Sequence, residues 1–212
     1  MNKHFLYVLY TFAIGLTLTT ALSAQEFSRF TGDIGGGFTQ PVGTTGRNLD
    51  EGWNIQGGFG MNFSPYIGAK IDLALNSFGL SSYALNSVGA PDGHVHVFSA
   101  TLDPIVHLNP KGHVDMYLIG GGGLYHWYQD FTQPSVATVT AFNPFFGFFP
   151  VTVPADQILG SYSVNKPGID GGAGIAIGTR FHGKIFAEAR YNRIFFSSGH
   201  ADFIPVSFGF RW

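Results

Sequence analysis

Apolar and polar side chains alternate along most of the chain after residue 24. The C-terminal segment shows this most clearly, because large apolar residues occupy every second position: Ile204, Val206, Phe208, Phe210 and Trp212. A period of two is typical of β-strands, whose successive side chains point to opposite faces of a sheet. The pattern predicts eight strands, over residues 30–39, 53–63, 66–78, 94–107, 114–127, 171–181, 184–196 and 203–212.

The connections between these strands alternate in length. The short links are residues 64–65, 108–113 and 182–183, and the longer ones are residues 40–52, 79–93 and 128–168, with 197–202 intermediate. Short turns at one rim and long loops at the other are typical of barrels that cross the bacterial outer membrane. We therefore expect both termini to face the periplasm.

The two faces of the predicted strands differ in chemistry. One face is aliphatic and aromatic, whereas the other carries glycine, serine, asparagine and single charges, which are too small and polar to fill a core. In lipid the apolar face of a barrel points outward, and the sheet must close so that every backbone group is paired. The sequence predicts an all-β fold, an eight-stranded antiparallel transmembrane up-and-down β-barrel. Tyrosines and tryptophans near strand ends are expected at the membrane interfaces: Trp53, Tyr66, Tyr117, Tyr125, Trp127, Tyr191 and Trp212.

The composition agrees with a membrane environment. Charged residues make up 11% of the 212 residues, hydrophobic residues 45%, and there are 30 glycines and no cysteine. About 25% charge is usual for soluble domains, so the composition argues against a water-soluble globule. It excludes a disordered chain and a disulfide-linked scaffold. The net charge of −2 gives no basic surface for nucleic acid.

The first 24 residues have the order of a secretory signal peptide. A basic start at Lys3 is followed by an apolar run over residues 5–18 and by the small residues of 21–24. We expect residues 1–24 to be removed and residues 25–212 to form one barrel domain with a long loop at 128–168.

At this point the chain resembles a known family over nearly all of residues 25–212. It is similar to the small eight-stranded outer-membrane barrels, the group of the OmpA transmembrane domain, OmpX and OmpW-like proteins. The segment Val206-Ser207-Phe208-Gly209-Phe210-Arg211-Trp212 resembles the C-terminal signal that the barrel-insertion machinery recognises. The resemblance implies that Phe208, Phe210 and Trp212 act in insertion, and that outer-membrane lipid and lipopolysaccharide are partners.

A barrel of eight strands has a lumen that side chains can fill. The charges expected to point inward are Asp33, Lys70, Asp72, Asp103, Asp170, Arg180, Glu188, Arg190 and Arg211. Buried charges persist when they are paired, so we expect an ion-paired network that plugs the lumen. A narrow polar path through it is the alternative.

The long loop contains an unusual apolar cluster: Phe142, Phe145, Phe146, Phe148 and Phe149. Exposed apolar patches mark contact with partners, lipid or ligands. The loop could cover the barrel mouth, form a hairpin with an apolar tip, or bind a small hydrophobic ligand. The β-branched runs 136–140 and 151–153 beside the cluster favour the hairpin.

These features predict a non-enzymatic outer-membrane protein with a structural or surface-interaction role and no cofactor. The alternatives are a narrow channel or an OmpW-like transporter of small hydrophobic molecules. A lipid A deacylase-type hydrolase is a further alternative, since Ser197, Ser198 and His200 resemble the end of that family in outline but lack its His-x-Ser pattern. His94 and His96 share a strand face but have no third ligand at a fixed spacing, so we assign no metal site.

Overall fold

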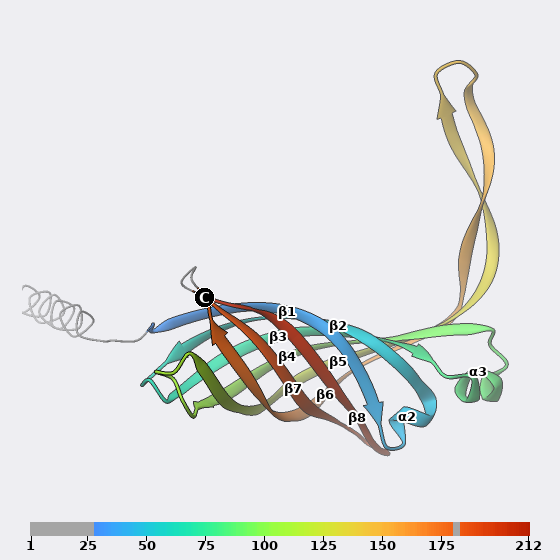
Figure 1. The fold of residues 1–212 in the computed structure, drawn as a ribbon. Coiled ribbons are helices and arrows are strands. Elements are labelled where there is room, and N and C mark those ends of the chain that lie inside the picture. Colours follow the sequence, from blue (N-terminus) through green and yellow to red (C-terminus); the bar gives the residue numbers. More distant parts are fainter. Residues whose placement is uncertain (1–27, 180–182) are drawn as a thin grey trace, which may run out of the picture.

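The computed structural model describes residues 28–179 and 183–212, in which eight antiparallel strands form one closed barrel (Figure 1). The strands are β1 (Phe30–Val42), β2 (Leu49–Asn62), β3 (Ile67–Leu80), β4 (Asp92–His107), β5 (Val114–Asn143), β6 (Gly147–Gly178), β7 (Lys184–Phe196) and β8 (Gly199–Arg211). The predicted signal peptide and Arg180 lie outside the described residues. The predicted fold class is confirmed.

The first and last strands close the barrel. They pair in an antiparallel register that runs from Asp33 opposite Arg211 to Val42 opposite Asp202. Each strand pairs with its neighbour in sequence, so backbone groups are paired around the ring, as lipid requires. Because the number of strands is even, β1 begins and β8 ends at the same rim (Figure 1).

The opposite rim carries two short helices that the alternation did not predict. They are α2 (Thr45–Asn48) and α3 (Ser82–Val88). The Ala84 amide donates a hydrogen bond of 3.3 Å to the Ser81 hydroxyl at the start of α3. Gly89 ends α3 in the left-handed region at φ 69°, which favours glycine. Within the described ranges, neither helix is long and apolar enough to cross a membrane.

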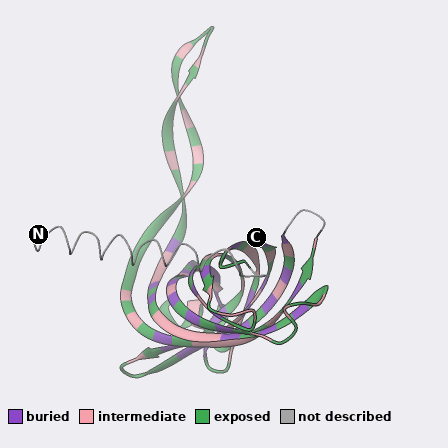
Figure 2. Ribbon diagram, turned by 90° about the vertical axis from the view of Figure 1, so that its left-hand side faces the viewer, coloured by how far each residue is buried: buried purple, intermediate pink, exposed green. Residues whose placement is uncertain are grey.

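The segment 128–168 forms a two-stranded hairpin, the alternative that its β-branched runs favoured, and not an irregular loop. β5 and β6 remain paired until Asn143 lies opposite Gly147, and their register shifts between Phe131 and Thr132. Gly147 closes the tip at φ 73°. Beyond the register shift the hairpin turns aside from the barrel axis and stands clear of the wall (Figures 1 and 2). Its β-branched runs explain why an isolated two-stranded ribbon forms there.

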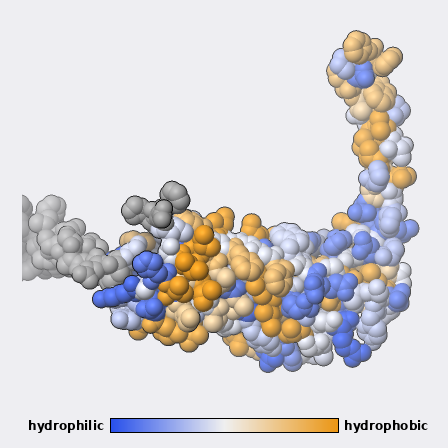
Figure 3. Space-filling view, viewed as in Figure 1, coloured by the Kyte–Doolittle hydropathy of each residue, from blue (hydrophilic) through white to orange (hydrophobic). Residues whose placement is uncertain are grey.

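The outer face of the barrel is apolar. Large hydrophobic side chains such as Ile34, Ile71, Leu102, Ile175 and Phe208 are between 43% and 59% exposed. They gather in a band over the middle of the barrel, with more hydrophilic surface towards both rims (Figure 3). This band is the surface expected to face lipid chains.

The interior is more apolar than predicted. A larger buried cluster lies towards the rim with the helices: Leu49, Phe78, Leu80, Val95, Val97, Tyr125, Trp127, Ile194, Ala201 and Phe203. A smaller cluster lies towards the other rim: Ile105, Tyr117, Ile119, Ala176 and Phe186. The interface assignment of Tyr117, Tyr125 and Trp127 is therefore wrong, because their side chains are between 0% and 9% exposed. They alternate with outward-facing neighbours and so point into the lumen.

Candidate functional site

A buried ion-pair network occupies the lumen between the two apolar clusters. Its place follows from strand order, since on β4 the acidic Asp103 lies between Val97 and Ile105. On β7 the charged positions likewise lie between Phe186 and Ile194. Neighbouring strands are in fixed register, so the charges form one layer across the barrel.

Arg190 is the centre of this network. Its Nη1 lies 2.8 Å from a carboxylate oxygen of Asp103 and 3.3 Å from one of Asp170. Its Nε donates to Glu188 at 2.6 Å, and its Nη2 donates to Asp72. The side chain of Arg190 is only 7% exposed. One guanidinium therefore joins carboxylates from β3, β4, β6 and β7, using the fork of donors that only arginine offers.

A second part of the network joins the first strand to the last. The Lys70 ammonium lies 2.9 Å from Asp33 and 3.0 Å from Asp72. Arg211 approaches Asp33 with Nε at 3.3 Å and donates to the Tyr117 hydroxyl from Nη2, also at 3.3 Å. The guanidinium carbon of Arg211 also lies 4.6 Å from the centre of the Tyr117 ring. These contacts tie β1, β3, β5 and β8 together across the lumen.

Eight of the nine residues predicted for the lumen lie in this network, and Arg180 is outside the described residues. Sequence reasoning missed Tyr117, whose hydroxyl donates to Glu188 at 2.8 Å. The described network contains five carboxyl groups and three cationic groups, so its acidic groups outnumber its basic ones. Three buried carboxylate oxygens of this network lack a partner among the described residues: Asp72 Oδ1, Asp103 Oδ1 and Asp170 Oδ1.

Sequence reasoning also missed a smaller polar cluster towards the rim with the termini. The Asp115 carboxylate is 1% exposed and lies 2.7 Å from His107 Nδ1 and 3.2 Å from the Lys184 ammonium. Asp115 and Tyr117 are two positions apart on β5, so their side chains point to the same face of the sheet. An inward direction for Tyr117 would therefore have predicted an inward direction for Asp115. The assignment of Tyr117 to the interface hid this signal.

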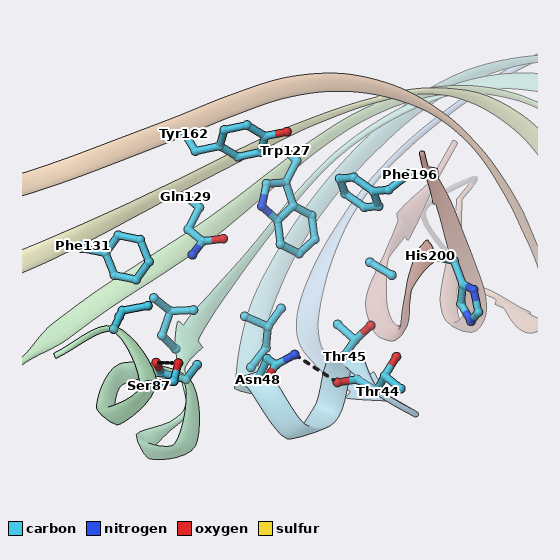
Figure 4. Close-up of a pocket in the computed structure, with 15 residues that line it drawn as sticks. Thr44, Thr45, Asn48, Ser87, Trp127, Gln129, Phe131, Tyr162, Phe196 and His200 are labelled. Carbon is cyan, nitrogen blue, oxygen red and sulfur yellow. Dashed lines mark hydrogen bonds between the residues drawn. The ribbon is translucent and has the colours of Figure 1, made fainter. Parts of the chain in front are cut away.

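A cavity of about 430 Å³ opens at the rim that carries the helices, and we call it the mouth cavity (Figure 4). Its lining comes from α2, α3, the base of the β5–β6 hairpin and the start of β8. Trp127 and Phe196 meet edge to face there, with ring centres 5.5 Å apart. The larger apolar cluster forms its floor, since Leu49, Leu80 and Trp127 belong to both.

The predicted contact phenylalanines lie at the tip of the hairpin, well away from the barrel wall (Figure 1). Phe145, Phe146 and Phe148 are 89%, 83% and 76% exposed. Phe142 and Phe148 pack against each other with ring centres 5.1 Å apart. The predicted insertion residues Phe208, Phe210 and Trp212 all point outward from the other end of the barrel.

The residues considered for catalysis are not arranged as a nucleophile and its base. His200 Nε2 lies 3.3 Å from Asp202, while Ser197 Oγ accepts a weak hydrogen bond from Lys166 at 3.5 Å. Among the described residues, neither Ser197 nor Ser198 is hydrogen-bonded to His200. His94 and His96 stack on the outer face with ring centres 6.4 Å apart. In residues 28–179 and 183–212, no group of three suitable side chains could hold a metal ion.

Comparison with known proteins agrees with this architecture. The neisserial surface protein NspA has 14% sequence identity and a TM-score of 0.56, over 87% of this chain and 96% of its own. A major outer membrane protein from Thermus thermophilus has 10% identity and a TM-score of 0.51, over 86% of this chain and 97% of its own. No curated protein sequence matches the chain. At these identities the two structures show the fold alone.

The profile of the outer membrane protein beta-barrel domain matches residues 11–211. That match covers most of the chain and agrees with the closed eight-stranded barrel and its apolar outer band. The chain therefore belongs to the outer membrane beta-barrel family and is a membrane protein of the Gram-negative outer membrane.

Proposed function

We propose that the protein is a non-enzymatic surface protein whose lumen is closed and whose β5–β6 hairpin makes the contacts outside the cell. The observation that carries the closed lumen is the set of four carboxylates held by Arg190. A cavity beside Arg190 measures only about 20 Å³, which is room for about one water molecule. With apolar clusters above and below this layer, no wide aqueous path is left among the described residues.

Conductance across a planar lipid bilayer tests the closed lumen. The purified protein should give no stepwise current, and removing residues 140–150 should not produce one, because the hairpin lies aside from the mouth. Stepwise current from the wild-type protein would support the channel alternative instead. An outer-membrane porin reconstituted in the same bilayer is the positive control.

The hairpin tip supports the surface role. Its phenylalanines are exposed on an arm that stands clear of the rest of the described chain, although exposed apolar clusters of this kind are rare on soluble surfaces. We infer that the tip binds apolar groups, with the lipid A acyl chains of the lipopolysaccharide around the barrel as the nearest ones. The parent protein should bind vesicles that contain lipopolysaccharide more tightly than vesicles that lack it. A Phe145→Ser/Phe146→Ser variant should bind both kinds of vesicle equally. Equal binding by the parent would contradict the assignment.

The proposed orientation places both termini in the periplasm and the hairpin outside. It is supported by the short turns at the rim with the termini and by the long hairpin at the other. An epitope inserted between Phe145 and Phe146 should be labelled by antibody on intact cells. An epitope between Pro110 and Lys111 should be labelled only after the outer membrane is opened.

The non-enzymatic assignment is supported by the separation of serine and histidine groups at the β7–β8 turn. A nucleophilic serine needs a base within hydrogen-bond reach, and among the described residues Ser197 is hydrogen-bonded to Lys166 and not to His200. The number of acyl chains on lipid A is the readout that tests this assignment.

A further inference from the structure

We propose that the mouth cavity binds one ring of an uncharged sugar. This goes beyond the proposed surface role, which needs no ligand in the cavity. Three observations carry the proposal: a lining without ionised groups, a set of unpartnered hydrogen-bonding groups, and an aromatic floor.

The lining is polar but uncharged. About half of its residues carry hydroxyl, amide or imidazole groups, and among the described residues none that lines it carries a carboxylate, ammonium or guanidinium group. A charged ligand would lose its hydration there without gaining an opposite charge. A neutral ligand with several hydroxyl groups would exchange its bonds to water for bonds to this lining.

Several of these polar groups have no partner within the described protein. The Trp127 indole N–H, the Gln129 amide and the Tyr162 hydroxyl make no hydrogen bond to another described residue. Figure 4 shows Gln129 and Tyr162 beside Trp127. Trp127 is 9% exposed, but its indole nitrogen is not one of the described buried polar atoms that lack a partner, so this donor is open to the cavity, and Tyr162 is 54% exposed. A ligand hydroxyl can replace water at these groups, since it can accept from the indole N–H while it donates to the amide oxygen.

The aromatic floor of the cavity fits the apolar face of a sugar ring. Trp127 and Phe196 meet edge to face, and Phe131 lies on the same side of the cavity (Figure 4). A pyranose has an apolar face of C–H groups and a rim of hydroxyl groups, so apolar contact and hydrogen bonding are needed at once. Pockets for small molecules commonly measure about 300–1,000 Å³, and about 430 Å³ admits one sugar ring with its substituents.

The proposal can be tested by fluorescence because Trp127 is one of only three tryptophans. Trp53 and Trp212 lie on the outer surface, so Trp53→Phe/Trp212→Phe leaves Trp127 as the single reporter. Methyl β-D-glucopyranoside and methyl α-D-galactopyranoside should give a saturable change in its emission, with a Kd of about 1 mM for the better ligand. No saturable change well above that concentration overturns the proposal.

Two further ligands distinguish the sugar chemistry from its alternatives. Glucose 6-sulfate should bind at least tenfold more weakly than the neutral glycosides, because the cavity offers its charge no partner. Cyclohexanol, which has the ring but a single hydroxyl, should also bind more weakly. Preference for either compound overturns the proposal.

A further comparison distinguishes a soluble sugar from lipopolysaccharide as the source of the bound sugar ring. Free methyl glycosides represent a soluble sugar, and the polysaccharide released from the cell's own lipopolysaccharide represents the surrounding surface. Tighter binding of the polysaccharide would assign the site to the lipopolysaccharide layer, and tighter binding of the glycosides to a soluble sugar. Either result supports the proposal, whereas failure of both overturns it.

A matched pair of variants on α3 locates the site. Ala84 lines the mouth cavity and Asn86 is exposed on the same helix outside the lining, so Ala84→Phe fills the cavity and Asn86→Phe does not. Calorimetry should show at least a tenfold loss of affinity for the first and none for the second. Trp127→Phe, which keeps an aromatic ring but removes the N–H, should lose roughly tenfold. Heat-modifiable migration on a gel shows whether each variant is folded, and equal affinities for the α3 pair would overturn the proposal.

Discussion

Replacing Arg190 with methionine should strongly destabilise the barrel. The substitution keeps a long side chain but removes the guanidinium that meets Asp72, Asp103, Asp170 and Glu188. Five described carboxyl groups would then share two cationic groups in a space with room for about one water molecule. Breaking a buried ion pair by removing one partner costs about 3–5 kcal/mol, because the remaining charge loses its compensation.

Urea unfolding of the protein refolded into lipid vesicles measures this cost. With a dependence of about 2 kcal/mol per molar urea, the midpoint should fall by roughly 1.5–2.5 M. Arg193→Met is the matched control on the same strand. Its side chain is 37% exposed, so solvent screens its ion pair with the less exposed Asp202 and the midpoint should move less than for Arg190→Met.

A compensating variant separates charge imbalance from loss of packing. Glu188→Gln and Asp103→Asn, added to Arg190→Met, remove two of the uncompensated charges and should recover at least half of the lost midpoint. Removing both partners of a buried pair is often nearly neutral, whereas removing one is not. The reasoning is refuted if Arg190→Met and Arg193→Met unfold at the same urea concentration, or if the compensating changes lower the midpoint further.

Three other outcomes follow from the same structure. A Cβ at Gly174 would overlap the Tyr117 ring, whereas one at Gly171 would meet nothing within 4 Å, so Gly174→Val should refold in lower yield than Gly171→Val; equal yields would contradict this packing. Tyr125→Phe removes the hydrogen bond of 2.9 Å to Asn192 and leaves a buried acceptor, which should cost about 1–3 kcal/mol in urea unfolding; an unchanged midpoint would argue against it. Expression in a Gram-negative host should leave the number of lipid A acyl chains unchanged by mass spectrometry, and the loss of one chain would refute the non-enzymatic assignment.

The alternation of side chains predicted the barrel because the side chains on the face towards lipid must be apolar. β7 was predicted with the bounds that it has in the structure, Lys184–Phe196. The positions of Asp33, Lys70 and Arg211 in the lumen followed from strand parity alone. What parity could not give was their partners, since these depend on the register between strands far apart in sequence.

The apolar interior was missed for a physical reason. On β4 both Val95 and Val97 point inward, while Phe98 and Leu102 point outward, so the segment has apolar residues on both faces. Periodicity cannot tell which face is inside when both are apolar. Because the lumen was assumed to be wholly polar, Tyr117 was assigned to the membrane interface. Only the closed geometry shows that its ring packs over Gly174 and beside Arg211.

The length of the hairpin sets the distance over which neighbouring copies can meet. The segment Thr132–Asn143 extends past the register shift and, at about 3.3 Å per residue, forms an arm about 40 Å long. Because this arm turns aside from the barrel axis, it would trace a circle around the barrel when the protein rotates about that axis (Figure 1). The distance at which two molecules can make contact is then set by the length of the arm and not by the radius of the barrel. In the proposed orientation, encounters at the cell surface would therefore occur at protein densities too low for barrels to touch.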